Sequence, residues 1–127
     1  MNYLIDTHVL IWYFEDSPNI PTKIINIIDS VTNHKYISSV SLWEIAIKTN
    51  IGKLKMSLSF DELLDEIASS DLTVLQVEDD YLKGILTLPF LHKDPFDRLI
   101  ISTAISENLT IITADENIQK YDTPWLW

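Results

Sequence analysis

Short apolar segments alternate along the chain with segments whose apolar residues recur at helical spacing. The apolar segments are predicted strands, at residues 2–5, 35–38, 72–77, 110–113 and, as an edge strand, 123–127. Helices are predicted between them, at residues 7–14, 21–31, 41–51, 59–68, 79–86, 94–107 and 114–120. Parallel strands need a crossover connection, usually a helix. The alternation therefore predicts an α/β fold with a mainly parallel sheet covered by helices on both faces.

The composition indicates one folded domain that spans residues 1–127. Apolar residues make up 46% of the chain, and no repeat or Gly/Ser-rich linker interrupts it. The apolar start lacks a basic region and contains Asp6 and His8, so we do not expect a signal peptide. Charges interrupt every apolar run well before the ~20 residues that a membrane span requires. There is no cysteine, which excludes disulfides and thiolate metal ligands.

The charge balance limits the class of partner. The chain has 19 Asp and Glu against 9 Lys and Arg, a net charge of −10. This excess argues against non-specific binding of nucleic acid by a basic face. If the acids meet in one pocket, however, divalent cations could reverse the local charge and attract a phosphate backbone.

Helix-start signals occur at three places. Ser41 and Glu44 have the spacing of a capping box that opens a helix ending near Gly52, and Ser59 and Glu62 repeat this signature. Asp94 precedes a proline, which places an N-cap and an N1 proline at the start of the long late helix.

Acidic residues follow several of the predicted strands, where ligands bind in open parallel sheets. They are Asp6, Glu44, Asp97 and Asp115. Each has an alternative role at a helix N-terminus, where a carboxylate contributes roughly 0.3–1 kcal/mol. A buried group of such acids needs a counter-charge, and few basic residues are near them in the sequence. Mg²⁺ or Mn²⁺ is the expected neutralising ion.

Four motifs in this order resemble those of PIN-domain ribonucleases. They are YLIDTHVLIW at 3–12, SSVSLWEI at 38–45, HKDPFDRLII at 92–101 and TAD at 113–115. The chain is most similar to toxins of the VapC type, in the branch whose third acidic motif reads H-x-D-P-F-D-R. The likeness extends from Met1 to the final PWLW.

This resemblance implies a three-layer α/β/α sandwich whose acids bind Mg²⁺ or Mn²⁺ and hydrolyse RNA phosphodiesters. Asp6, Glu44, Asp97 and Asp115 match the acidic positions of the family, and the motif spacing favours Asp97 over Asp94. Asp94 is then an N-cap or an outer acid that supports the site. The resemblance also implies a cytoplasmic protein, a homodimer, and a cognate antitoxin that covers the acidic site.

Other side chains near these acids are further candidates. Thr7, Ser39 and Thr113 could orient carboxylates, waters or phosphate oxygens, or could cap helices. Arg98 is expected either to contact substrate phosphate or to pair with an acid. His92 lies beside the acidic motif, whereas His8 is expected to be a structural residue. The four tryptophans, Trp12, Trp43, Trp125 and Trp127, are expected as core or interface residues rather than base-stacking platforms.

Two other classes of protein remain as alternatives. Receiver-type signalling modules also gather acids around Mg²⁺ at the edge of a parallel sheet, but they need a lysine after a late strand. No lysine directly follows the predicted strands at 72–77 or 110–113. A catalytically silent PIN-like domain that only binds a partner is the second alternative, although all four acids are present.

Overall fold

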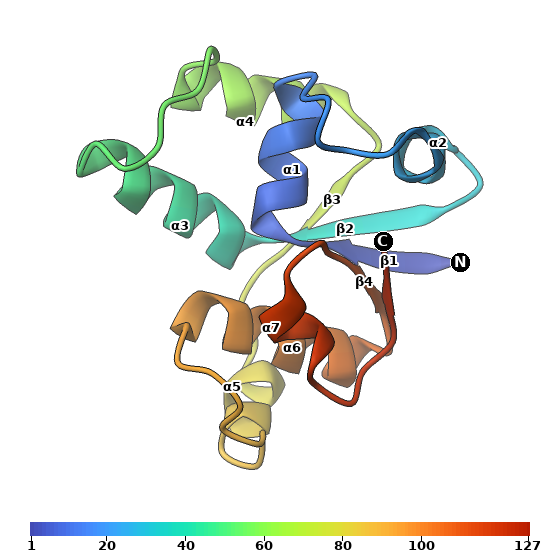
Figure 1. The fold of residues 1–127 in the computed structure, drawn as a ribbon, viewed down its shortest axis with the longest axis vertical. Helices are drawn as coiled ribbons and strands as arrows, with labels where there is room; N and C mark the ends of the chain where they lie inside the picture. Colours follow the sequence, from blue (N-terminus) through green and yellow to red (C-terminus); the bar gives the residue numbers. More distant parts are fainter.

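The strands form one five-stranded parallel sheet, and the computed structural model describes residues 1–127 (Figure 1). The strands are β1 (Asn2–Ile5), β2 (His34–Ser38), β3 (Thr73–Leu75), β4 (Thr110–Ile112) and β5 (Trp125–Leu126). Their order in the sheet is β3-β2-β1-β4-β5, and every neighbouring pair is parallel. Receiver-type sheets have the order 2-1-3-4-5 instead. The topology therefore contradicts the signalling alternative.

Seven helices cover the two faces of the sheet. They are α1 (Thr7–Phe14), α2 (Thr22–Asp29), α3 (Ser39–Asn50), α4 (Phe60–Ser69), α5 (Asp79–Ile85), α6 (Pro95–Glu107) and α7 (Glu116–Gln119). Figure 1 shows α1 to α4 on one side of the sheet and α5 to α7 on the other. This arrangement confirms the predicted three-layer α/β/α sandwich. None of the helices is long and apolar enough to cross a membrane.

Two apolar clusters hold the layers together, because successive side chains of a strand point to opposite faces. In β1, Tyr3 and Ile5 belong to the cluster under α1 to α4. Leu4, between them, belongs to the cluster under α6 and α7, together with Ile100 and Ile111. The central strand is thus buried on both faces, as expected for a parallel sheet.

Several predicted elements are longer than the observed ones. Only Thr73–Leu75 of the predicted strand 72–77 pairs with β2, and only Trp125–Leu126 of the segment 123–127 pairs with β4. Helix α2 stops at Asp29, and Val31, predicted to continue its apolar face, is 84% exposed. The apolar pattern in the sequence is therefore longer than the strand or helix, because an element ends where its backbone hydrogen bonds end.

The helix-start signals gave one wrong prediction and two correct ones. Helix α3 begins at Ser39, and its N-cap is Ser38, whose hydroxyl accepts from Val40 N. Ser41 is therefore inside the helix, and the capping box predicted with Glu44 is wrong. Ser59 and Glu62 form the predicted capping box of α4.

At the start of α6, Asp94 is the predicted N-cap and is followed by proline. Gly52 has a φ of +76° just after α3, where a left-handed backbone favours glycine. These signals depend on local backbone geometry, which explains why the sequence alone predicts them.

Candidate metal-dependent active site

The carboxyl edge of the sheet holds Asp6 in a fixed position. Ile5 pairs in register with Ile112, so the residues that follow them, Asp6 and Thr113, lie side by side. Thr113 Oγ1 donates to Asp6 Oδ2 at 2.9 Å, and Thr7 N donates to Asp6 Oδ1 at 2.7 Å. Burial raises the pKa of Asp6 to about 6, even though these hydrogen bonds act in the opposite direction. The carboxyl group is therefore oriented by its neighbours but removed from water.

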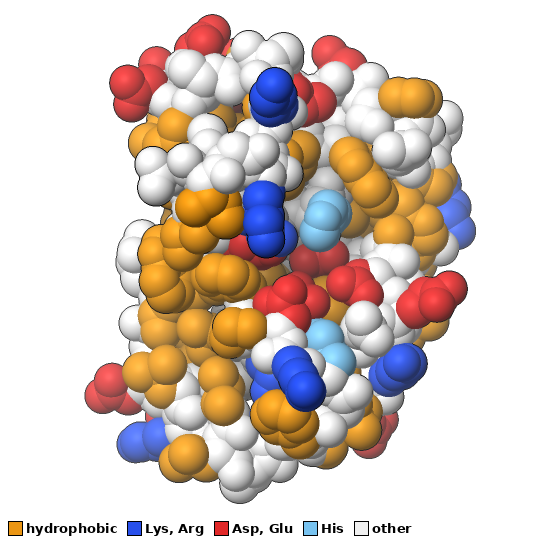
Figure 2. Space-filling view, turned by 60° about the vertical axis from the view of Figure 1, so that its left-hand side comes forward, with side chains coloured by type: hydrophobic (Ala, Val, Ile, Leu, Met, Phe, Trp, Pro, Cys, Tyr) orange, Lys and Arg blue, Asp and Glu red, His pale blue; other side chains and the backbone are white.

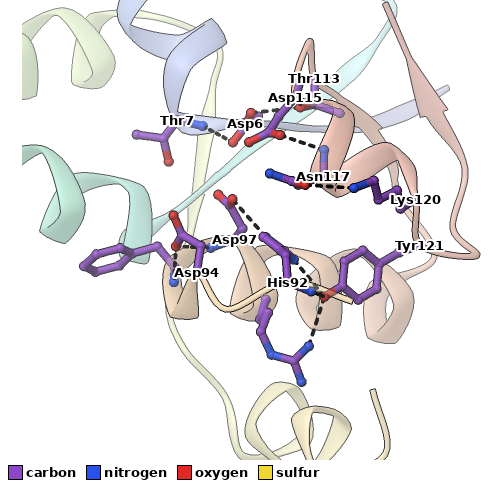
Figure 3. Close-up of polar contacts among 12 residues, drawn as sticks. Asp6, Thr7, His92, Asp94, Asp97, Thr113, Asp115, Asn117, Lys120 and Tyr121 are labelled. Atoms are coloured by element: carbon purple, nitrogen blue, oxygen red, sulfur yellow. Dashed lines mark hydrogen bonds and ion pairs between the residues drawn. The ribbon is translucent and has the colours of Figure 1, made fainter. Parts of the chain in front are cut away.

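Asp97 faces Asp6 from the first turn of α6. It is 8% exposed, and Figure 3 shows its carboxyl group turned toward those of Asp6 and Asp115. Burial, and after it the nearby carboxylates of Asp6, Asp94, Asp115 and Glu44, raise the pKa of Asp97 to about 8. Four acids from four segments of the chain therefore act on one buried carboxyl group.

Glu44 reaches the same centre from α3. Its Oε2 accepts from Lys48 Nζ at 2.6 Å, one helical turn away. Its Oε1 is buried and has no hydrogen-bond partner. A buried carboxylate oxygen without a partner costs free energy, so this atom is available for a ligand.

A hydrogen-bonded chain of side chains supports Asp97 from the opposite side. His92 Nε2 lies 3.2 Å from Asp97 Oδ2, and His92 Nδ1 lies 2.8 Å from the Tyr121 hydroxyl. Arg98 donates from Nη1 to the same hydroxyl at 3.0 Å and to Pro89 O at 2.8 Å. Figure 3 shows this chain passing from Asp97 through His92 to Tyr121. It fixes the orientation of His92 against the acid.

Helix capping accounts for some of the acids but not for all of them. Asp6, Asp94 and Asp115 each occupy an N-cap position and accept a backbone N–H at the start of α1, α6 and α7. Asp97 and Glu44 accept no backbone N–H and lie inside their helices. The alternative of simple capping therefore does not explain the two acids that are buried without such a partner.

The oxygen atoms gathered here fit a hard divalent cation. As the side chains stand, no three His, Asp or Glu residues form a group that could hold a metal ion. The donors are carboxylate oxygens, the ligands that Mg²⁺ and Mn²⁺ prefer. Asp97 is buried among like charges, and Glu44 Oε1 lacks a partner, so a cation would relieve both costs. Asp6, Glu44, Asp97 and Asp115 are the residues that would hold it, after their side chains turn closer together than they stand here.

Comparison with known proteins identifies the family. The PIN domain family matches residues 3–124. The chain belongs to the PIN domain family. PIN domains are nucleases, which generally use divalent metal ions. No curated protein sequence matches this PIN domain.

Solved structures share the fold of this PIN domain at low sequence identity. VapBC2 from Rickettsia felis, bound to a DNA fragment from its promoter, aligns with a TM-score of 0.75 and 21% identity over 99% of this chain and 98% of that chain. DNA-bound VapBC from Salmonella typhimurium has a TM-score of 0.69 and 19% identity, with 99% and 97% covered. VapBC-5 from Mycobacterium tuberculosis, of the VapBC family of toxin-antitoxin systems, has a TM-score of 0.63 and 17% identity, with 98% and 95% covered.

Of the other predicted site residues in this PIN domain, some contact the acids directly and others do not. Thr113 contacts Asp6 directly, whereas the Thr7 hydroxyl donates to Ser41 Oγ at 2.8 Å. Ser39 is half-buried in the first turn of α3. Arg98 is buried, and its guanidinium lies over the Phe90 ring and forms no ion pair with an acid. Arg98 therefore supports the loop before α6 and the Tyr121 hydroxyl.

The predictions for His8 and for the four tryptophans have different outcomes. His8 was expected to be structural, but it is exposed. The tryptophans are predicted in a core or an interface. Trp12 and Trp127 are half-buried and pack against the apolar cluster under α1 to α4, as predicted for core residues. Trp43 and Trp125 are 61% and 43% exposed, so they do not belong to the core of this chain.

Sequence reasoning missed two residues of this site. The spacing of Glu44 and Lys48 is that of an i,i+4 ion pair, a signal that could have predicted their contact. Nothing in the sequence near Tyr121 indicates that its hydroxyl would bond to both His92 and Arg98. Such contacts depend on how α7 packs against α6.

Proposed function

We propose that this PIN domain is a Mg²⁺- or Mn²⁺-dependent endoribonuclease and the VapC-type toxin of a toxin–antitoxin pair. The observation that supports it most directly is the convergence of Asp6, Glu44, Asp94 and Asp115 on the buried carboxyl group of Asp97. Such a concentration of negative charge is costly in a protein without a ligand and favourable with a divalent cation. The family membership supplies the reaction class.

The residues of the site would orient and activate the reactants. A bound Mg²⁺ or Mn²⁺ supplies Lewis-acid polarisation of the phosphate and lowers the pKa of a coordinated water. Asp6, Glu44, Asp97 and Asp115 would hold the ion. Thr113 and the backbone of Thr7 restrict the rotation of the Asp6 carboxyl group. No residue is placed to act as a covalent nucleophile, so hydrolysis by water in a single displacement suits this set of side chains.

His92 and Asp97 form a second functional contact. The hydrogen bond from the Tyr121 hydroxyl and the edge-to-face contact of the two rings, with centroids 5.3 Å apart, fix the His92 imidazole beside Asp97 Oδ2. This contact orients Asp97 in the same way that an imidazole or hydroxyl orients many metal-binding carboxylates. We assign His92 as a positioning residue for Asp97.

The proposed partners are RNA, a cognate antitoxin and a second copy of the chain. The similar structures from Salmonella and Mycobacterium are VapBC assemblies, which supports the antitoxin partner. A strongly acidic toxin is complementary to a basic side chain of a partner that covers the site. Exposed apolar side chains on α5, α6 and the loop between them offer a surface for the homodimer: Leu82, Leu86, Phe90, Leu91 and Ile105.

The test of this function is cleavage of a mixed-sequence RNA by the purified chain. We expect cleavage with Mg²⁺ or Mn²⁺, none with EDTA, and none for Asp6→Asn or Asp97→Asn. Circular dichroism must show that each variant is folded. Asp65→Asn, which removes an exposed carboxylate from α4, is the matched control and should cleave normally.

Two outcomes would contradict the proposal. If the folded wild type binds Mn²⁺ at the acids but leaves every RNA intact, also after denaturation and refolding to remove co-purified antitoxin, the silent PIN-like domain is the correct alternative. If no metal binds, the acids have only structural roles, and the nuclease proposal is wrong.

A further inference from the structure

A second hollow adjoins the carboxylate centre, between α1, α3 and the segment that follows α3. It has a volume of about 310 Å³ and shares Thr7 and Glu44 with the centre. Its other lining residues include His8, Ile11, Trp12, Lys48, Lys53 and Leu54. We call it the α1–α3 pocket. A molecule bound there would lie directly beside the acids.

The α1–α3 pocket concentrates positive charge on an acidic protein. Only 9 of the 127 residues are Lys or Arg, yet Lys48 and Lys53 both line this one hollow. Lys48 bonds to Glu44 at the shared wall, whereas Lys53 is exposed and forms no ion pair. Figure 2 shows basic and histidine side chains bordering the acidic group in a hollowed part of the surface. Lys48 is neutralised by Glu44, so Lys53 is the lysine of this pocket that is available to an anionic group next to the acidic centre.

The same pocket has an aromatic wall. The rings of His8 and Trp12 lie 6.2 Å apart, and those of Trp12 and Trp127 lie 5.8 Å apart. His8 is exposed and Trp12 is half-buried, so part of this row of rings faces solvent. Unpaired bases stack on aromatic side chains, and lysine binds phosphate as a point charge. Aromatic rings and free positive charge together suit a nucleotide better than either a purely apolar segment or a simple anion.

We propose that the α1–α3 pocket binds the nucleotide adjacent to the scissile phosphate, with its base against Trp12 and His8 and its phosphate near Lys53. This assignment rests on the proposed ribonuclease function. It specifies single-stranded RNA as the substrate class, because the bases of a helix are stacked on each other and unavailable to the rings. The pocket also accounts for the exposure of His8, which a structural role does not explain.

Two paired lysine variants test the phosphate contact. Anisotropy of a fluorescent eight-nucleotide RNA of mixed sequence is measured with the full chain in Ca²⁺, and cleavage is measured in Mn²⁺. Lys53→Ala should weaken binding about fivefold and lower the slope of log K against log salt by ~0.7, the value for one phosphate contact on a single strand. Lys55→Ala is the matched control, because Lys55 is exposed on the same segment but lines a different hollow.

Variants of Trp12 test the stacking contact. Trp12→Leu keeps an apolar side chain against the core but removes the ring, and it should weaken binding about tenfold, within the range for one stacked base. Trp12→Phe should restore most of the affinity. The cleavage rate at saturating RNA should change much less than the half-saturating concentration, because the variants leave the acids in place. Melting temperatures confirm that each variant is folded.

The outcomes separate this proposal from the ribonuclease function. If wild-type chain binds and cuts RNA but Lys53→Ala and Lys55→Ala behave alike, and Trp12→Leu has no effect, the pocket proposal is wrong and the nuclease stands. If the pocket variants bind RNA normally but lose affinity for the antitoxin, the pocket is a protein-docking site instead. If wild-type chain neither binds nor cuts RNA, both proposals are wrong.

Discussion

Helix α1 has acidic side chains around both of its ends, and the two ends differ in how those acids are held. At the N-terminal end, Asp6 is buried beside Asp97 at the carboxyl edge of the sheet. At the C-terminal end, Glu15 and Asp16, with Asp29 and Glu66 from neighbouring helices, line a larger hollow of about 700 Å³. Size and acidity alone would favour the wrong end.

At the C-terminal end, Glu15 and Asp29 have protein partners, and Asp16 and Glu66 are exposed to water. Both carboxylate oxygens of Glu15 accept hydrogen bonds from Ser57, and Asp29 accepts one from the hydroxyl of Tyr13. At the N-terminal end, Asp97 and Glu44 are buried, and Glu44 Oε1 has no partner. The candidate active site is therefore distinguished by carboxylates that are buried and incompletely hydrogen-bonded, rather than by the number of acids.

The largest expected difference between the two ends is in catalysis. Asp97→Asn should lower RNA cleavage by about 10³-fold or more, because metal-assisted stabilisation of the transition state is worth several kcal/mol. Glu15→Gln should leave the rate within about twofold. Initial rates on one labelled RNA in Mn²⁺ measure both. If Asp97→Asn and Glu15→Gln lose the same fraction of the cleavage rate, the active site is not confined to the N-terminal end of α1.

Mn²⁺ is expected to bind only at the N-terminal end of α1, and this binding should stabilise the folded chain. Mn²⁺ at about 100 times its dissociation constant should stabilise the wild type and Glu15→Gln by about 2.7 kcal/mol. Asp97→Asn should gain much less, because one carboxylate ligand is missing. Thermal unfolding with and without Mn²⁺ measures the shift. An undiminished shift in Asp97→Asn would place the ion elsewhere.

With metal removed by EDTA, the free energy of unfolding should depend on pH through Asp97 at the N-terminal end of α1 and not through the acids at its C-terminal end. Because the pKa of Asp97 is raised to about 8, the folded chain retains a proton that the unfolded chain releases near pH 4. The stabilising contribution of that proton is complete below pH 4 and disappears as the pH rises to 8. Asp97→Asn should therefore flatten the profile and exceed the wild type in stability at pH 8 by several kcal/mol, because each unit of pKa shift corresponds to about 1.4 kcal/mol.

Urea unfolding between pH 4 and 9 measures this effect, and Asp6 adds to it in the same direction up to about pH 6. Glu15→Gln serves as the control and should keep the wild-type profile. A wild-type stability that increases from pH 6 to 8 in EDTA would contradict the assignment, because the carboxyl group would then not be destabilised by burial.

The smallest effect belongs to the C-terminal end. Tyr13→Phe removes the hydroxyl that donates to Asp29 and should lower the free energy of unfolding by about 1 kcal/mol, the net value of a typical hydrogen bond. Activity and Mn²⁺ affinity should be unchanged. Chemical denaturation and a metal titration together check this prediction. Lower metal affinity would mean that the two ends of α1 are coupled.

The sequence predicted the features that depend on local patterning. The alternation of strands and helices indicated the parallel sandwich, and parallel topology placed Asp6 and Thr113 at one edge. Asp94 was predicted as an N-cap because aspartate followed by proline is typical of a helix start. The position of Asp97, one turn further, followed from the same helix.

The sequence did not predict contacts that depend on the packing of distant elements. Ser41 has the spacing of a capping residue, yet the helix begins earlier, and the Ser41 hydroxyl accepts from Thr7 across two helices. The exposure of Trp43 could not be predicted from its type, because large apolar residues are usually buried. The link from Tyr121 to His92 needs the placement of α7, which no local signal encodes.

The hydrogen bond between Thr113 and Asp6 joins residues that are 107 positions apart. Because a ribosome adds ~5–20 residues per second, Asp6 waits roughly 5–20 s before its partner is synthesised. Strand β4, which carries the polypeptide to Thr113, must also pair with β1 before that bond can form. A nascent chain of this protein therefore cannot complete the contact that orients Asp6 until nearly the whole domain has been synthesised.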